Sequence, residues 1–250
     1  MIYRPLGPSG MNVSVISFGA WQIGDDDFWG PDERADAKRT VQEALDAGVN
    51  FFDTAEAYGK GESERVLGKC LGSRRREVLL ASKVSTENCA PDRLRAACEG
   101  SLKRLGTDYL DLYQVHWPPR DVPFSDVAGA LQALVDEGKI RAAGLSNFGP
   151  GDMDEWFAHG GALSNQIGYN MLFRAPEHEL LPECRRRGLG VLVYMPLMQG
   201  LLAGRYDSVE DIPMLRRRTR HFSCHRDGTR HGELGHETIL METVLDLRDF

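Results

Sequence analysis

Residues 50–59 read Asn50-Phe51-Phe52-Asp53-Thr54-Ala55-Glu56-Ala57-Tyr58-Gly59, a short apolar strand that runs into polar residues. The carboxyl end of this strand carries Asp53, and Tyr58 follows in the loop. The next two predicted strands end in Lys83 and His116. In an α/β barrel, residues at strand ends meet at one mouth although they lie far apart in the sequence. The sequence therefore predicts one active site that contains these four side chains.

The chain on either side alternates short apolar strands with segments of helical period. Seven strands are predicted, over 13–19, 50–54, 77–83, 110–116, 139–147, 164–168 and 190–197, after a hairpin around 7–10. Helices are predicted over 33–47, 62–71, 91–105, 125–137, 151–158 and 177–187. This alternation predicts parallel strands covered by helices, which is an α/β fold of the (β/α)8 TIM-barrel type. We expect one domain over 1–250.

The last part of the chain, 198–250, shows no eighth strand. Residues 198–235 are rich in Arg, Gly and His without an alternating apolar run, and 237–249 follow helical spacing. A barrel without its closing strand exposes two parallel edges. We expect the sequence to be the front part of a longer chain. A chain that borrows a strand or leaves the barrel open is the alternative.

Composition sets the broad class. A length of 250 residues suits one α/β barrel. No apolar run approaches the roughly 20 residues that span a bilayer, and no signal core begins the sequence, so we expect a cytoplasmic protein without a membrane partner. The five cysteines form no C-x-x-C pair and are interpreted as reduced thiols. The net charge of −7 argues against a nucleic-acid partner but not against an anionic cofactor.

The four strand-end residues suit carbonyl reduction. A tyrosine titrates near pH ~10, and the ammonium of Lys83 beside Tyr58 is expected to lower the pKa of that tyrosine, with Asp53 keeping the lysine charged. His116 can hydrogen-bond a substrate oxygen or relay a proton. A coenzyme can then deliver hydride to carbon while the tyrosine protonates oxygen. Singly, each residue has a structural explanation, such as a helix cap, but their shared strand-end position favours catalysis.

Five motifs in order, within residues 3–205, resemble the aldo-keto reductases, a family of NADPH-dependent (β/α)8 barrels. They are Asp53–Gly59, Lys83, Leu112–Pro118, Gly144–Phe148, and Tyr194–Leu197 with Gly200–Gly204. The resemblance implies that Tyr58 is the general acid, that Lys83 and Asp53 tune it, and that His116 orients the substrate. Implied NADP contacts are Gly19, Ala20, Trp21, Ser146, Asn147, Gln166, Tyr194, Leu197, Gly200 and Leu202.

Within that set, Ser146, Asn147 and Gln166 would bind the nicotinamide carboxamide, and Tyr194 would stack on the ring. The family normally places its eighth strand and its 2′-phosphate site beyond residue 250, so a preference for NADP rests on the resemblance alone.

Other side chains are candidates for pocket or metal residues. Phe28, Trp29 and Trp117 are expected in the substrate pocket, whereas Phe124 is expected to pack at a helix start. His221, Cys224, His225, His231 and His236 match no standard zinc spacing, so we expect no metal site. The arginine-rich segment 216–220 is expected to be a solvated face.

Two functions remain at this point. The first is an oxidoreductase that uses NADPH to reduce a small-molecule aldehyde or ketone to an alcohol. The alternative is a non-catalytic nucleotide-binding or regulatory barrel subunit, which could keep Asn147, Gln166 and Tyr194 without the other motif residues. The presence of all four strand-end residues favours the enzyme.

Overall fold

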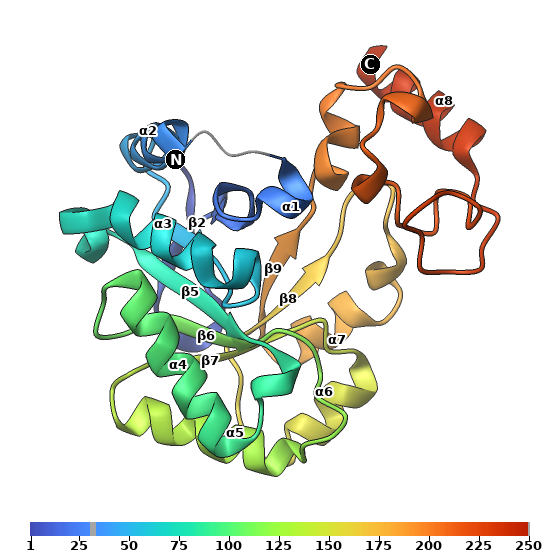
Figure 1. Ribbon diagram of the computed structural model, residues 1–250. Helices are drawn as coiled ribbons and strands as arrows, with labels where there is room; N and C mark the ends of the chain where they lie inside the picture. The colour runs from blue at the N-terminus through green and yellow to red at the C-terminus, as the bar shows by residue number, and fades with distance from the viewer. Residues whose placement is uncertain (31–33, 250) are drawn as a thin grey trace. The chain divides into compact units, whose positions relative to one another are not determined.

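The computed structural model describes residues 1–30 and 34–249 (Figure 1). Position 33, the first residue of one predicted helix, lies outside these ranges. The chain forms two compact units, one made of 1–167 with 176–192 and the other of 168–175 with 193–250. In the described ranges, no helix combines the length and the apolar character that crossing a membrane requires. The expectation of a single domain stays a prediction.

The first unit begins with the expected hairpin. Strands β1 (Tyr3–Pro5) and β2 (Asn12–Ser14) pair antiparallel, and a short 3₁₀ turn over Gly7–Ser9 joins them. The predicted strand over 13–19 is therefore wrong in its first half. The Ser14 hydroxyl donates to the carbonyl of Ile16 at 2.7 Å, and the chain bends there. The first strand of the main sheet, β3, is only Phe18–Gly19.

The main sheet holds seven strands in sequence order, β3 to β9. After β3 come β4 (Phe51–Asp53), β5 (Leu79–Val84), β6 (Leu112–Val115), β7 (Ala143–Ser146), β8 (Ser164–Gly168) and β9 (Gly190–Tyr194). Neighbours from β3 to β8 pair in parallel. This arrangement confirms the predicted (β/α) barrel class, because parallel strands in sequence order need a crossover between each pair.

Helices provide the crossovers. They are α1 (Asp26–Trp29), α2 (Arg34–Asp46), α3 (Glu62–Leu71), α4 (Pro91–Leu105), α5 (Phe124–Asp136), α6 (Pro150–Trp156) and α7 (Leu180–Arg186). The bounds of α4 match the prediction because Pro91 suits the first helical turn and Gly106 adopts the left-handed conformation that ends it. Consecutive helices from α2 to α6 pack on one another, and α4 and α5 lie against the sheet (Figure 1).

The two faces of the sheet have different partners. Phe52, Leu80 and Tyr113 belong to the large core shared with the helices. Their neighbours Phe51, Ala81 and Leu112 belong to a smaller core on the inner face, together with Leu6 of the hairpin region. Since side chains alternate along a strand, residues two positions further on also point inward. Asp53, Lys83 and Gln114 occupy those positions.

The second unit has its own apolar core. Three short 3₁₀ segments, Met198–Ala203, Val209–Asp211 and Met214–Arg216, precede helix α8 (Glu237–Asp249). Its buried side chains include Leu201, Phe222, Leu240 and Val244. Between residues 198 and 249 the structure contains no strand, as predicted, and α8 has the predicted bounds.

Two helical glycines provide a matched test of packing. An ideal Cβ on Gly68 of α3 would overlap the backbone of Leu105 in α4, whereas a Cβ on Gly129 of α5 would meet nothing within 4 Å. We expect Gly68→Ala to lower the free energy of unfolding by about 1–3 kcal/mol through overpacking. Gly129→Ala should raise it by about 0.5–1 kcal/mol. Equilibrium urea unfolding of both variants checks this, and equal effects would contradict the close approach of α3 and α4.

Candidate active site

The Lys83 side chain is the centre of the candidate site. It lies at the carboxyl end of β5 and is fully buried, at 0% exposure. Its Nζ donates to Asp53 Oδ2 at 2.5 Å, to the Thr54 carbonyl at 2.9 Å and to Tyr58 Oη at 3.2 Å. An ammonium has three N–H donors, so all of them are used. The ion pair and the hydrogen bond to Tyr58 place the lysine between a carboxylate and a phenol.

The loop that carries Tyr58 is fixed by a close backbone contact. Tyr58 begins a 3₁₀ turn that ends at Gly61. Gly59, the next residue, has a φ of 54°, and an ideal Cβ on it would overlap the carbonyl oxygen of Gly24. Only glycine tolerates both the left-handed conformation and this approach. The loop after β3 therefore lies directly against the Tyr58 turn.

Burial and neighbouring charges together set the pKa values of this cluster. Burial raises the pKa of Tyr58, and the nearby charge of Lys83 lowers it by less, so the net direction is upward. The expectation of a lowered tyrosine pKa is thus wrong, because desolvation of the phenolate outweighs the lysine. Burial also opposes the charge on Lys83, but Asp53 and Tyr58 raise the pKa of the lysine overall. A protonated phenol beside an ammonium is suited to give a proton away.

His116 completes the set. It follows β6, its backbone N–H donates to the Val84 carbonyl at 3.0 Å, and its ring meets the Tyr58 ring edge-on with centroids 5.6 Å apart. Burial, and then the charge of Lys83, lowers the pKa of His116 to about 3. The structure therefore brings together the four predicted residues, with a neutral imidazole beside the phenol. Their roles in catalysis stay a prediction.

The lowered pKa of His116 has a measurable consequence. An NMR titration should show no protonation of His116 between pH 5 and 8, where an ordinary histidine titrates near about 6.5. Because the folded-state pKa is depressed, the histidine stabilises the fold above the unfolded-state pKa, and this contribution is lost as the pH falls from about 6.5 toward 3. The unfolding free energy relative to His116→Gln should follow that trend. A titration midpoint near 6.5 would contradict the burial of the ring.

A cluster of aromatic side chains packs against the Tyr58 ring through Trp21. Trp21 stacks on Tyr58 with ring centroids 5.4 Å apart and on Phe28 at 4.4 Å, and Trp29 meets the Trp21 ring edge-on at 5.3 Å. Phe28 and Trp29 thus contact Trp21, which in turn contacts Tyr58, and their role in a substrate pocket stays a prediction. Trp21, assigned to the coenzyme by resemblance, lies in the same cluster. Trp117 is 53% exposed.

Polar residues suited to a nicotinamide carboxamide gather at the ends of β7 and β8. The Asn147 backbone N–H donates to the Gln166 carbonyl at 2.9 Å. The Asn147 side-chain amide donates to the His116 carbonyl at 3.0 Å and to Ser146 Oγ at 3.1 Å. Hydroxyl and amide groups can both donate to and accept from another amide, so this donor set fits a carboxamide. At the end of β3, Ala20 is buried, and an ideal Cβ on Gly19 would meet nothing within 4 Å.

The remaining residues assigned to the coenzyme belong to the second unit. In that unit the Tyr194 ring lies against Gly168, with ring carbon Cζ 3.1 Å from an ideal Cβ on the glycine. Gly200 has a φ of 101°, and Leu197 is 55% exposed. Leu202 packs at the edge of the core of the second unit. Their approach to a coenzyme stays a prediction.

The structure tests two minor expectations, those for Phe124 and for 216–220, whereas the expected lack of a metal site stays a prediction. Phe124 is buried and its ring packs on Phe148 and Trp156, as expected for a helix start. Among the residues that the structure describes, His, Cys, Asp and Glu form no group of three or more placed to hold a metal ion. The segment 216–220 is not a uniformly solvated face, because Arg216 donates to Tyr206 Oη at 2.9 Å.

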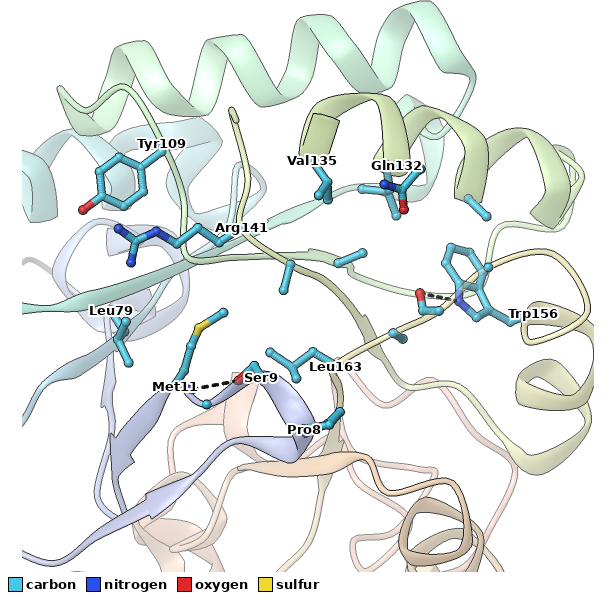
Figure 2. Close-up of a pocket in the computed structure, with 18 of the residues that line it drawn as sticks. Pro8, Ser9, Met11, Leu79, Tyr109, Gln132, Val135, Arg141, Trp156 and Leu163 are labelled. Atoms are coloured by element: carbon cyan, nitrogen blue, oxygen red, sulfur yellow. Dashed lines mark hydrogen bonds between the residues drawn. The ribbon is translucent and has the colours of Figure 1, made fainter. Parts of the chain in front are cut away.

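A large cavity lies at the opposite end of the strands. It has a volume of about 1180 Å³ and is lined by the hairpin region, the start of β5, β7 and β8, and one side of α5. Figure 2 shows Met11 and Leu163 facing Val135 and Gln132 of α5 across it. None of the four predicted catalytic residues lines this cavity. This cavity is therefore separate from the candidate active site.

Comparison with known proteins agrees with this geometry. Residues 15–238 match the sequence profile of the aldo/keto reductase family. An aldo-keto reductase of Bacillus subtilis, YhdN, is 38% identical over 215 residues, which cover 82% of this chain and 65% of the relative. The NADH-specific methylglyoxal reductase of Escherichia coli is 37% identical over 223 residues, which cover 80% of this chain and 68% of the relative. The structure of a Klebsiella pneumoniae aldo/keto reductase, solved with NADP and acetate, is 34% identical in sequence and has a TM-score of 0.72. The match covers 80% of this chain and 69% of that protein.

The parallel strands and their crossover helices define a (β/α)-barrel protein. The chain belongs to the aldo/keto reductase family. It spans about two thirds of the length of the curated relatives that it matches.

One polar residue at the site was missed by sequence reasoning. Gln114 lies on β6, two residues before His116, and its side-chain amide donates to Asp53 Oδ1 at 3.1 Å. The available signal was its spacing from Leu112, which places it on the inner face of the strand.

Proposed function

We propose that the chain reduces an aldehyde or ketone to an alcohol with NADPH as the hydride donor. The observation that carries this proposal is the position of Lys83 Nζ, 3.2 Å from Tyr58 Oη and 2.5 Å from Asp53 Oδ2. A buried phenol next to an ammonium can donate its proton and leave a stabilised phenolate. A binding-only barrel has no use for that arrangement.

Each residue of the cluster has its own role in the proposed reaction. When bound, the nicotinamide supplies the hydride. Tyr58 gives its hydroxyl proton to the carbonyl oxygen, and the Lys83 ammonium stabilises the phenolate that remains. Asp53 keeps the lysine charged and in place. His116, neutral at ordinary pH, hydrogen-bonds the same substrate oxygen and so orients the carbonyl toward Tyr58.

Ser146, Asn147 and Gln166 would hold the carboxamide of the coenzyme. Gln166 Nε2 donates to Asp53 Oδ1 at 3.0 Å, which leaves its Oε1 to accept from the carboxamide nitrogen. Tyr194, Leu197, Gly200 and Leu202 would contact the ring and the pyrophosphate, as the resemblance implies.

The substrate class follows from the aromatic side chains near Tyr58. Trp21, Phe28 and Trp29 offer an aromatic wall beside the phenol, which suits a small carbonyl compound with an apolar body. Methylglyoxal is a reasonable first probe, because one relative is named for its reduction.

We place the protein in the cytoplasm as a single catalytic domain. Its five cysteines form no disulfide and four of them are buried, in keeping with a reducing compartment.

The test measures NADPH binding by fluorescence and NADPH oxidation in the presence of methylglyoxal and a panel of aromatic aldehydes. We expect both binding and turnover. Binding without turnover on any aldehyde would favour the non-catalytic alternative. If the chain neither binds NADPH nor oxidises it with any aldehyde, the proposed function is wrong.

A further inference from the structure

The Asp53 carboxylate is held from two sides inside the sheet. Its Oδ2 accepts from Lys83, while its Oδ1 accepts from Gln114 Nε2 at 3.1 Å and from Gln166 Nε2 at 3.0 Å. The three residues that meet at Oδ1 come from β4, β6 and β8. Alternate strands of a barrel contribute side chains to the same interior layer. This layer is polar, where an apolar one is usual.

The chemistry of a carboxylate fixes the direction of both amides. An ionised carboxylate only accepts hydrogen bonds, so each glutamine must turn its nitrogen toward Asp53. Gln114 is fully buried, at 0% exposure, and its Oε1 has no hydrogen-bond partner among the described residues. A buried carbonyl without a partner costs free energy. A leucine or methionine would fill the same space without that cost, so packing does not account for the glutamine.

The neighbouring strand leaves room for this side chain. An ideal Cβ on Gly144 of β7 would lie 2.9 Å from Gln114 Cγ. Any side chain at 144 would therefore crowd Gln114 and also Leu112, whose Cδ1 lies 2.9 Å from the same Cβ position. Gly144 in β7 therefore leaves room for the hydrogen bond from Gln114 on β6 to Asp53 on β4.

We propose that Gln114 is a positioning residue for carbonyl reduction, acting through Asp53 and Lys83 on the proton donor Tyr58. The inference rests on the proposed function. Gln114 fixes one carboxylate oxygen, so that the other is aimed at Lys83 Nζ and the lysine is aimed at the phenol. It is not a catalytic residue, because its amide contacts Asp53 and not the hydroxyl that gives the proton.

The first test is Gln114→Met, which keeps the volume and removes the donor. We expect kcat to fall by about 10- to 100-fold, the cost of a misaligned reacting group. KM and the Kd for NADPH should stay within about twofold, since no binding group is removed. Tyr113→Phe is the matched control, because Tyr113 precedes Gln114 on the same strand but belongs to the outer core. An unchanged kcat in Gln114→Met would overturn the proposal.

A double-mutant cycle separates positioning from a general structural effect. If Gln114 acts only through Asp53, then Gln114→Met should cause no further loss of kcat in a chain that already carries Asp53→Ala. Losses that multiply would overturn the proposal. Thermal unfolding of each variant shows whether the compared proteins are folded at the assay temperature.

A titration without substrate keeps the test independent of turnover. The phenolate absorbance of Tyr58 is obtained by subtracting the titration of the matching Tyr58→Phe chain. Because the charge of Lys83 lowers the pKa of Tyr58, loosening the lysine should move the Tyr58 midpoint upward in Gln114→Met. An unchanged midpoint overturns the positioning role, even if the parent chain reduces aldehydes. A shifted midpoint in a chain without turnover supports that role and counts against the proposed function instead.

Discussion

Tyr58→Phe is expected to reduce the rate of carbonyl reduction by about a thousandfold while the Kd for NADPH stays nearly unchanged. The substitution removes only the hydroxyl that Lys83 Nζ contacts at 3.2 Å, and general acid catalysis typically contributes about 10²- to 10⁴-fold. The ring remains to stack on Trp21, so the pocket should keep its shape. Steady-state turnover with methylglyoxal and fluorescence titration with NADPH measure the two quantities.

Tyr3→Phe provides the control. Its hydroxyl donates to the Gly48 carbonyl at 2.8 Å on an exposed part of the hairpin region. The same chemical change there should leave turnover as it is. Normal turnover in Tyr58→Phe would exclude this tyrosine as the acid.

Lys83→Met should have the largest effect on stability. It removes the cation from a buried pair and leaves Asp53, only 9% exposed, with two amide donors but no opposite charge. Breaking a buried ion pair in this way typically costs about 3–5 kcal/mol. Urea unfolding should show a loss of that order, and carbonyl reduction should disappear with it.

A companion variant distinguishes stability from catalysis. The double change Lys83→Met with Asp53→Leu replaces the whole pair by apolar side chains, which is often close to neutral for stability. We expect most of the lost stability to return and the activity to stay absent. Recovered activity in the double variant would show that the pair is only structural.

The elements with strong local signals could be predicted from the sequence. The bounds of α4 follow from Pro91 and Gly106, and those of α8 from its apolar spacing. The first strand could not be predicted correctly, because Val13 and Phe18 belong to one apolar run. Ser14 exchanges hydrogen bonds with Asn50, far along the chain, and so belongs to the hairpin.

The composition of the site could be predicted, but its electrostatics could not. Strand ends identified Asp53, Lys83 and His116, because parallel strands bring their carboxyl ends together. The pKa of Tyr58 depends on how completely the folded chain excludes water from the hydroxyl. No local sequence pattern predicts that degree of burial. Gln114 was missed because one glutamine between apolar residues looks incidental until its partner is known.

The two units differ in a property that matters for spectroscopy. All four tryptophans of the chain, Trp21, Trp29, Trp117 and Trp156, belong to the first unit. Intrinsic tryptophan emission therefore reports the state of the barrel strands and their helices. It carries no direct signal from 193–249. Far-ultraviolet circular dichroism also detects α8, so the two signals recorded on one sample can tell whether the units lose their structure together or one after the other.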